Sequence, residues 1–141
     1  VVDAQKIGRT SDRRQIAADQ FFTGLFSTAL EPGELITAIG FPKPTKAGYA
    51  KFEQRASRFA LVGVFVAQTS GGVRVAVTGS GGNGVFRVPE LEKALAVNFS
   101  PDACKGITLK ADDMLSDIHG SAEYRAAMVP VMAARAVAAA K

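Results

Sequence analysis

Two valine-rich apolar runs, residues 61–68 and 73–78, are the feature that most constrains the fold of this chain. Only a short link separates them, and residues 70–72 of that link read Ser-Gly-Gly. Two strand-like runs joined in this way are typical of an antiparallel hairpin. A further run, residues 49–56, alternates apolar and polar residues as a half-buried strand does. The sequence therefore predicts a small antiparallel sheet of three or four strands.

Helical patterns follow these strands. Residues 89–97 begin with a proline and two nearby glutamates, which is a favourable helix start. Ser121 is a good N-cap for a longer helix over residues 121–140, whose apolar residues recur at helical spacing. Pro130 lies inside that pattern and predicts a kink or a break. Strands followed by helices favour an α+β fold, with about three helices packed on one face of the sheet.

The beginning of the chain has a different character. Residues 34–42 alternate as another strand, and prolines at its end stop it because proline offers no ladder donor. Residues 43–48 are interpreted as a linker. We therefore expect two domains, residues 1–45 and residues 46–141. The first of these is too short to build a core, so we expect it to borrow one from sequence outside the chain.

Composition excludes several classes of function. The 141 residues are 48% hydrophobic and 21% charged, as in a soluble globular protein. No apolar run approaches the roughly 20 residues that a membrane span needs. The net charge is +4, but the basic residues are scattered and no nucleic-acid motif accompanies them. The single cysteine, Cys104, cannot form an internal disulfide or a cysteine-based metal centre, which fits a reducing, cytoplasmic location.

The residues capable of chemistry do not form a complete catalytic site. His119 is the only histidine, so no second histidine or cysteine can join it as a metal ligand. We interpret Asp112, Asp113 and Asp117 as solvated loop carboxylates. Residues 79–84 have the G-x-G-x-x-G spacing, but strand-like sequence and a proline follow them instead of a helix. Because a phosphate site of this type needs a helix N-terminus, the sequence predicts a flexible loop there.

One charged row leaves two interpretations open. Lys51, Glu53 and Arg55 are two residues apart, which places them on one face of the predicted strand. Such a row is usually solvated. Lys51 and Arg55 could also face a bound anion or an adjoining domain.

Four segments, taken in order along the chain, are more specific to one family than the patterns above. They are residues 14–24 (RQIAADQFFTG), 28–36 (TALEPGELI), 51–60 (KFEQRASRFA) and 117–125 (DIHGSAEYR). Together they resemble the medium, FAD-binding subunit of carbon monoxide dehydrogenase and of the xanthine dehydrogenase-like molybdenum hydroxylases. The likeness covers essentially the whole chain, and the last segment is fairly specific.

The resemblance implies both a fold and a role. It implies the end of a flavin-binding domain, followed by a C-terminal domain with an antiparallel sheet and three helices. In that family the medium subunit works with a molybdenum-cofactor large subunit and an iron–sulfur small subunit. Electrons pass from molybdenum through the iron–sulfur clusters to FAD and on to an acceptor. The family's glycine-rich motifs for the FAD pyrophosphate have no counterpart here, so we expect FAD in the full-length subunit and none on this chain alone.

The resemblance also implies two flavin-binding residues. Ile36 aligns with an apolar residue beside the flavin, and Lys51 falls near a basic position that closes over the ring. A positive charge there would stabilise the reduced flavin. Relatives commonly have aspartate where Arg58 stands, so a local contact differs. The alternative is a subunit-interaction or dimerisation module with no flavin contact, by analogy of fold alone. The substrate of the whole enzyme stays open.

Overall fold

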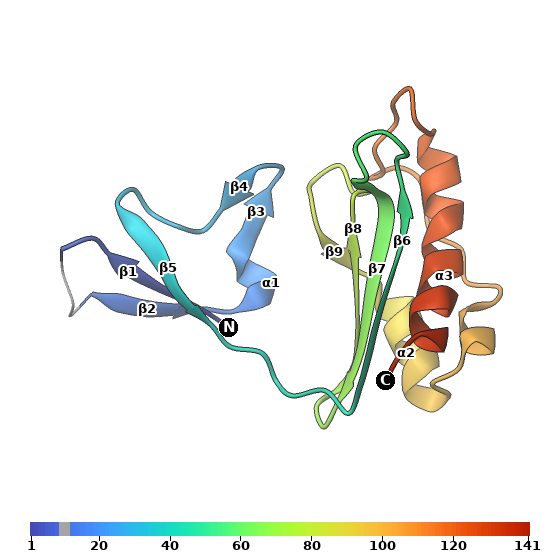
Figure 1. Ribbon diagram of the computed structural model, residues 1–141, viewed down its shortest axis with the longest axis horizontal. Helices are drawn as coiled ribbons and strands as arrows, with labels where there is room; N and C mark the ends of the chain where they lie inside the picture. Colours follow the sequence, from blue (N-terminus) through green and yellow to red (C-terminus); the bar gives the residue numbers. More distant parts are fainter. Residues whose placement is uncertain (9–11) are drawn as a thin grey trace. The chain divides into compact units, whose positions relative to one another are not determined.

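The computed structural model describes residues 1–8 and 12–141 of the chain. These residues form two compact units, Val1–Pro42 and Lys43–Lys141, which we call unit 1 and unit 2. Each unit has sheet structure of its own (Figure 1). Each also has a buried apolar cluster.

Unit 1 is built on a three-stranded antiparallel sheet in the order β2-β1-β5. Its strands are β1 (Val2–Lys6), β2 (Arg13–Ile16) and β5 (Glu34–Ile39). Between β2 and β5 the chain forms a short helix, α1 (Ala18–Phe21), and a small hairpin of β3 (Phe22–Gly24) and β4 (Ser27–Thr28). The predicted strand over residues 34–42 is therefore present, but it ends at Ile39.

A small core holds unit 1 together. Val2 and Ala4 alternate on one face of β1, and Val2 lies opposite Ile16 of β2. Phe21 at the end of α1 joins these three residues in a buried cluster. Unit 1 thus has a small cluster of its own, which the sequence did not predict, but Ile7, Phe26 and Phe41 are each largely exposed. That this part of the chain borrows further core from elsewhere stays a prediction.

Unit 2 contains a four-stranded antiparallel sheet in the order β6-β7-β8-β9. Its strands are β6 (Lys46–Glu53), β7 (Ala60–Thr69), β8 (Gly72–Thr78) and β9 (Phe86–Arg87). The predicted hairpin is confirmed, since Thr69 pairs with Gly72 across its turn. Strand β6 starts inside the segment predicted to be a linker. It also ends earlier than predicted, where the Oε1 atom of Gln54 accepts backbone hydrogen bonds from Ala56 and Ser57.

Three helical segments complete unit 2. They are α2 (Pro89–Val97), a 3-10 turn η1 (Pro101–Cys104) and α3 (Ala122–Ala138). Ser121 is the predicted N-cap, and its Oγ accepts a hydrogen bond of 3.2 Å from the backbone N–H of Tyr124. Pro130 does not split α3, which is assigned as one helix through that position. Val129, Met132 and Ala133 on either side of Pro130 are buried, and this packing offsets the lost backbone hydrogen bond.

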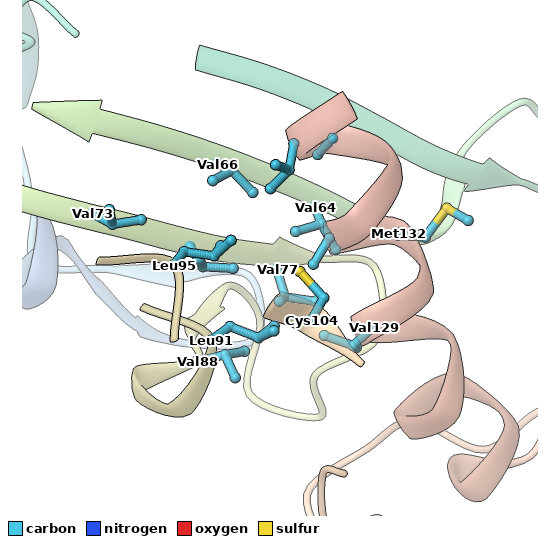
Figure 2. Packing of buried hydrophobic residues seen from close by; sticks show 14 of the residues in the cluster. Val64, Val66, Val73, Val77, Val88, Leu91, Leu95, Cys104, Val129 and Met132 are labelled. Carbon is cyan, nitrogen blue, oxygen red and sulfur yellow. The ribbon is translucent and has the colours of Figure 1, made fainter. Parts of the chain in front are cut away.

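The helices of unit 2 cover one face of its sheet. The buried valines of β7 and β8 point toward the helices, where they meet Leu91 and Leu95 of α2 and Val129 and Met132 of α3 (Figure 2). Those valines are Val62, Val64, Val66, Val73, Val75 and Val77. The predicted α+β fold, with helices on one face of a small antiparallel sheet, is confirmed.

Helix α3 lies very close to strand β6. A Cβ atom on Gly48 would overlap the backbone carbonyl oxygen of Ala136 and come within 3.0 Å of the backbone nitrogen of Ala140. The last residue of the chain continues this contact, since Ala47 and Lys141 exchange two backbone hydrogen bonds. Glycine at position 48 is therefore what allows the helix to pack on this strand.

Candidate functional site

The face of the unit 2 sheet opposite the helices carries the candidate site. Tyr49 of β6 pairs with Phe65 of β7, and both side chains are nearly half exposed, at 49% and 44%. The next row on this face joins Lys51 to Gly63 and Thr78. The tips of the neighbouring side chains lie over Gly63, because a Cβ there would be 2.7 Å from Tyr49 Oη and 2.6 Å from Thr78 Oγ1 and both would have to shift. A cation thus lies beside an aromatic surface.

Lys51 is held on this face by two oxygen atoms. Its Nζ donates a 2.8 Å hydrogen bond to the backbone carbonyl of Arg58 and lies 3.4 Å from Glu53 Oε2. The Lys51 side chain is still 37% exposed. The ammonium group is therefore oriented by its neighbours and remains accessible to a ligand.

The loop between β6 and β7 supplies the carbonyl that Lys51 contacts. Gln54 and Phe59 close the loop with a 2.9 Å backbone hydrogen bond, and the Arg58 N–H donates to the Gln54 carbonyl at 2.8 Å. Arg58 has φ of 60°, in the left-handed region that few residues other than glycine adopt. Arg55 lies in this loop, outside β6, so the prediction that it shares the strand face of Lys51 was wrong.

Ile36, the other predicted flavin-binding residue, lies in unit 1. It is the third residue of β5, pairs with Ala4 of β1, and is 43% exposed. Ile39 of the same strand, which pairs with Val2 across the sheet, is also about half exposed, at 53%. Leu35, at 57%, precedes Ile36 directly and therefore lies on the opposite face. An apolar strand surface is therefore available around Ile36 in unit 1.

A buried arginine in unit 2 was not singled out by the sequence reasoning. Arg125 of α3 is 2% exposed, and its Nη2 donates 2.8 Å hydrogen bonds to both carboxylate oxygens of Asp117. Its Nη1 donates to the carbonyls of Leu61 and Gly79 at 2.9 and 3.0 Å. Asp117 was predicted to be a solvated carboxylate, but it is the partner of this arginine. The sequence signal was an acidic and a basic residue flanking the helix N-cap.

The pKa of Asp117 is lowered from its ordinary value. The main cause is the backbone N–H of His119, which donates a 2.8 Å hydrogen bond to Asp117 Oδ1, and the Arg125 guanidinium adds to it. His119 takes part through this backbone group, and its side chain is exposed. Among the described residues, no group of three or more histidine, cysteine or acidic side chains could hold a metal ion.

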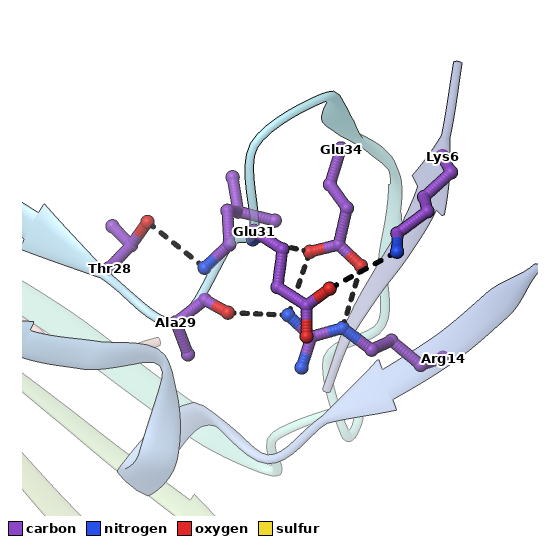
Figure 3. Close-up of polar contacts among 7 residues, drawn as sticks. Lys6, Arg14, Thr28, Ala29, Glu31 and Glu34 are labelled. Atoms are coloured by element: carbon purple, nitrogen blue, oxygen red, sulfur yellow. Dashed lines mark hydrogen bonds and ion pairs between the residues drawn. The ribbon is translucent and has the colours of Figure 1, made fainter.

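A second arginine–carboxylate pair organises unit 1. Arg14 donates two 2.7 Å hydrogen bonds to the carboxylate of Glu34 and a third to the carbonyl of Ala29 (Figure 3). The Glu31 N–H donates to the same Glu34 carboxylate at 2.6 Å. The Arg14 hydrogen bond, followed by that of Glu31, lowers the pKa of Glu34 from 4.5 to about 2. The pair fixes the start of β5, two residues before Ile36.

This pair predicts a pH dependence for unit 1. Because the Glu34 pKa is lower in the folded chain, its contribution to stability is complete above pH 4.5 and is lost as the pH falls toward about 2. An NMR titration of the Glu34 side-chain carboxyl should show the low pKa, and Arg14→Gln should return it toward the ordinary value. A native midpoint near 4.5 would contradict the role of the pair.

The glycine-rich loop over residues 79–84 does not offer a phosphate cradle. The N–H of Gly82 donates to the Asp113 carbonyl at 2.7 Å, and that of Gly84 donates to the Gly81 carbonyl at 3.2 Å. The short strand β9 follows the loop, as the strand-like sequence indicated. A cavity of about 510 Å³ lies between this loop and residues 108–114. The amides of Gly82 and Gly84 are therefore bonded within the chain and not available to an anion.

Comparisons with known proteins give one consistent result. The nicotine 6-hydroxylase medium subunit of Paenarthrobacter nicotinovorans is 35% identical over 135 residues, covering 89% of this chain and 47% of that protein. The carbon monoxide dehydrogenase medium chain of Afipia carboxidovorans is 35% identical over 143 residues, covering 91% and 48%. The glyceraldehyde dehydrogenase medium chain of Sulfolobus acidocaldarius is 31% identical over 140 residues, covering 92% and 50%. No protein-family model matches the chain.

A solved structure shares the fold. Quinoline 2-oxidoreductase from Pseudomonas putida 86 matches 97% of this chain and 50% of its own, with a TM-score of 0.72 and 19% sequence identity. The relatives define a class, the medium subunits of hydroxylases and dehydrogenases. This chain matches four curated medium subunits over 89–92% of its length, so the resemblance to the medium subunits of carbon monoxide dehydrogenase and its relatives is confirmed. It spans about half the length of the curated relatives that it matches.

The lengths and apolar character of the helices also bear on membrane proteins. In the part of the chain that the structure describes, none of them is long and apolar enough to cross a membrane.

Proposed function

We propose that this chain is the C-terminal part of a FAD-binding medium subunit. Residues 1–45 are then the end of its flavin-binding domain, and residues 46–141 are its C-terminal domain. In this role the chain helps to close the FAD site. It also helps to assemble a complex with a molybdenum-cofactor large subunit and an iron–sulfur small subunit, in which electrons pass through FAD to an acceptor.

The open sheet face of unit 2 is the observation that carries the proposal. The flavin ring of FAD is flat and aromatic, and when bound it supplies the redox chemistry. Tyr49 and Phe65 offer a half-exposed aromatic surface, and Lys51 presents an oriented cation beside it. A cation near the ring favours the reduced flavin, which carries more negative charge. These residues fit the ring of FAD chemically.

Unit 1 contributes an apolar contact in this proposal. Ile36 would bind the flavin through its exposed side chain on β5, which the Arg14–Glu34 pair holds in place. The pyrophosphate of FAD would be held elsewhere in the full-length subunit, because the amides of Gly82 and Gly84 are already bonded. The chain alone would then bind no FAD.

The alternative function is subunit interaction or dimerisation without flavin contact. Phe59 is 79% exposed in the β6–β7 loop, and Phe65 on the adjoining face is 44% exposed. Exposed apolar side chains of this kind suit contact with another protein chain. The charge on Lys51 separates the two functions, because a flavin depends on it and an apolar interface does not.

The test is Lys51→Ala in the full-length subunit. We expect it to raise the dissociation constant of FAD about 3- to 10-fold, which corresponds to the loss of one hydrogen bond to the ring, roughly 1 kcal/mol. The measurement is a fluorescence titration of the apo-subunit with FAD. Lys93→Ala, which removes an exposed lysine from α2, is the matched control and should leave binding unchanged. Unchanged FAD binding in Lys51→Ala would favour the interaction role.

A further inference from the structure

A β-bulge interrupts the sheet next to Lys51. Phe52 of β6 pairs with Val62 of β7, but the following residue, Glu53, pairs with Ala60. Leu61 is therefore an extra residue with no partner in β6. Bulges bend a strand and change the direction of side chains near them, and they occur frequently beside functional sites. This one lies at the end of β6 that carries Lys51 and Glu53.

A tight backbone approach lies on the other side of the bulge. Gly79 follows β8 with φ of 79°, in the left-handed region, and a Cβ at this position would overlap the carbonyl oxygen of Ala60. Gly79 therefore packs directly on the backbone beside Leu61. The carbonyls of Leu61 and Gly79 both lie outside the regular hydrogen-bond ladder of the sheet, so each needs another donor.

Arg125 supplies that donor to both positions. Its Nη1 bonds the carbonyls of Leu61 and Gly79, and its Nη2 is held by the carboxylate of Asp117. The neighbouring Tyr124 contacts the ring of Phe52 edge-on, with ring centroids 6.1 Å apart. The start of α3 thus contacts the bulge through Arg125, and it contacts Phe52, the strand residue next to Lys51, through Tyr124.

We infer that Arg125 is a positioning residue for the flavin site, acting through Lys51. By holding Leu61 and Gly79 it sets the geometry of the bulge and of the adjoining β6–β7 loop. That loop presents the Arg58 carbonyl to which Lys51 Nζ is bonded. Loss of the Arg125 contacts should therefore move the ammonium group even though Arg125 is buried on the helix side. This inference rests on the proposed function, because it needs Lys51 to act on the flavin.

The experiment is a double-mutant cycle in the full-length subunit. Arg125→Lys keeps the charge but cannot bridge the carbonyls and the carboxylate together. We expect it to raise the FAD dissociation constant about fivefold in the native background and less than twofold when Lys51→Ala is also present. Arg125→Lys should also shift the reduction potential of the flavin in the native background, and this shift should be lost when Lys51→Ala is present. Arg135→Lys, an exposed arginine later in α3, is the matched control.

The outcomes separate the two proposals. If Lys51→Ala weakens FAD binding but Arg125→Lys does not, or if the two effects add, Arg125 is only structural and the inference is overturned. If Lys51→Ala has no effect, the proposed function fails and the inference fails with it. Should Arg125→Lys not fold, Asp117→Asn keeps the arginine and removes the carboxylate that orients it. The same cycle with Asp117→Asn must then show the same non-additive result.

Discussion

Replacing Gly48 with alanine is expected to lower the free energy of unfolding of unit 2 by about 3 kcal/mol or more, the upper range for overpacking. The added Cβ would overlap the carbonyl of Ala136, which is backbone and cannot rotate away. Helix α3 would have to move off β6. Urea denaturation followed by helical circular dichroism measures the effect, because α2 and α3 both lie in unit 2.

Gly71→Ala is the matched control for this substitution. Gly71 lies in the β7–β8 turn of the same unit, and the nearest atom to an added Cβ is Thr69 Oγ1 at 3.7 Å, an ordinary contact. It should change the free energy of unfolding by less than about 1 kcal/mol. Equal losses at both positions would show that the close packing of α3 on β6 does not exist in solution.

Arg125→Met is expected to destabilise unit 2 by about 3 kcal/mol. The substitution keeps an apolar stem but leaves the carbonyls of Leu61 and Gly79 without the donor that now satisfies them. An unsatisfied buried polar group costs about 1–3 kcal/mol, and hydrogen bonds to a charged group are the stronger kind. The same urea denaturation measures the loss.

Arg135→Met provides the comparison, since Arg135 is an exposed arginine of the same helix. Its loss should cost no more than about 1 kcal/mol, mostly through the charge it places near the helix C-terminus. If Arg125→Met were as mild as Arg135→Met, water would be replacing the guanidinium, and the bulge would not depend on Arg125.

Local patterns predicted the sheet and helices of unit 2 well. The valine runs favour strands, the Ser-Gly-Gly link favours a hairpin turn, and Ser121 favours a helix start. The folded chain has all three. Of the kink or break predicted at Pro130, the break is absent, because the buried residues before and after Pro130 keep α3 packed although one backbone donor is missing. The core of unit 1 was missed because four small or scattered apolar residues become a cluster only after the strands pair.

The candidate site shows where sequence reasoning ends. Alternation placed Lys51 on a strand face, but the early end of β6 depends on the side chain of Gln54 bonding its own turn. Arg125 binds groups as far as 64 residues away in the sequence, and no local sequence pattern predicts a contact over such a separation. In the sequence, an arginine that becomes buried cannot be distinguished from a surface arginine, because the groups that bind it lie in distant segments.

The reduction potential of the flavin in the full-length subunit tests the central claim most directly. If Lys51 lies beside the ring, Lys51→Ala should make the two-electron potential more negative by about 30 mV, equivalent to about 1.4 kcal/mol of lost stabilisation of the reduced flavin. Lys93→Ala should leave the potential unchanged. A potential that is the same in Lys51→Ala and in the native subunit would contradict the assignment of this sheet face to the flavin site.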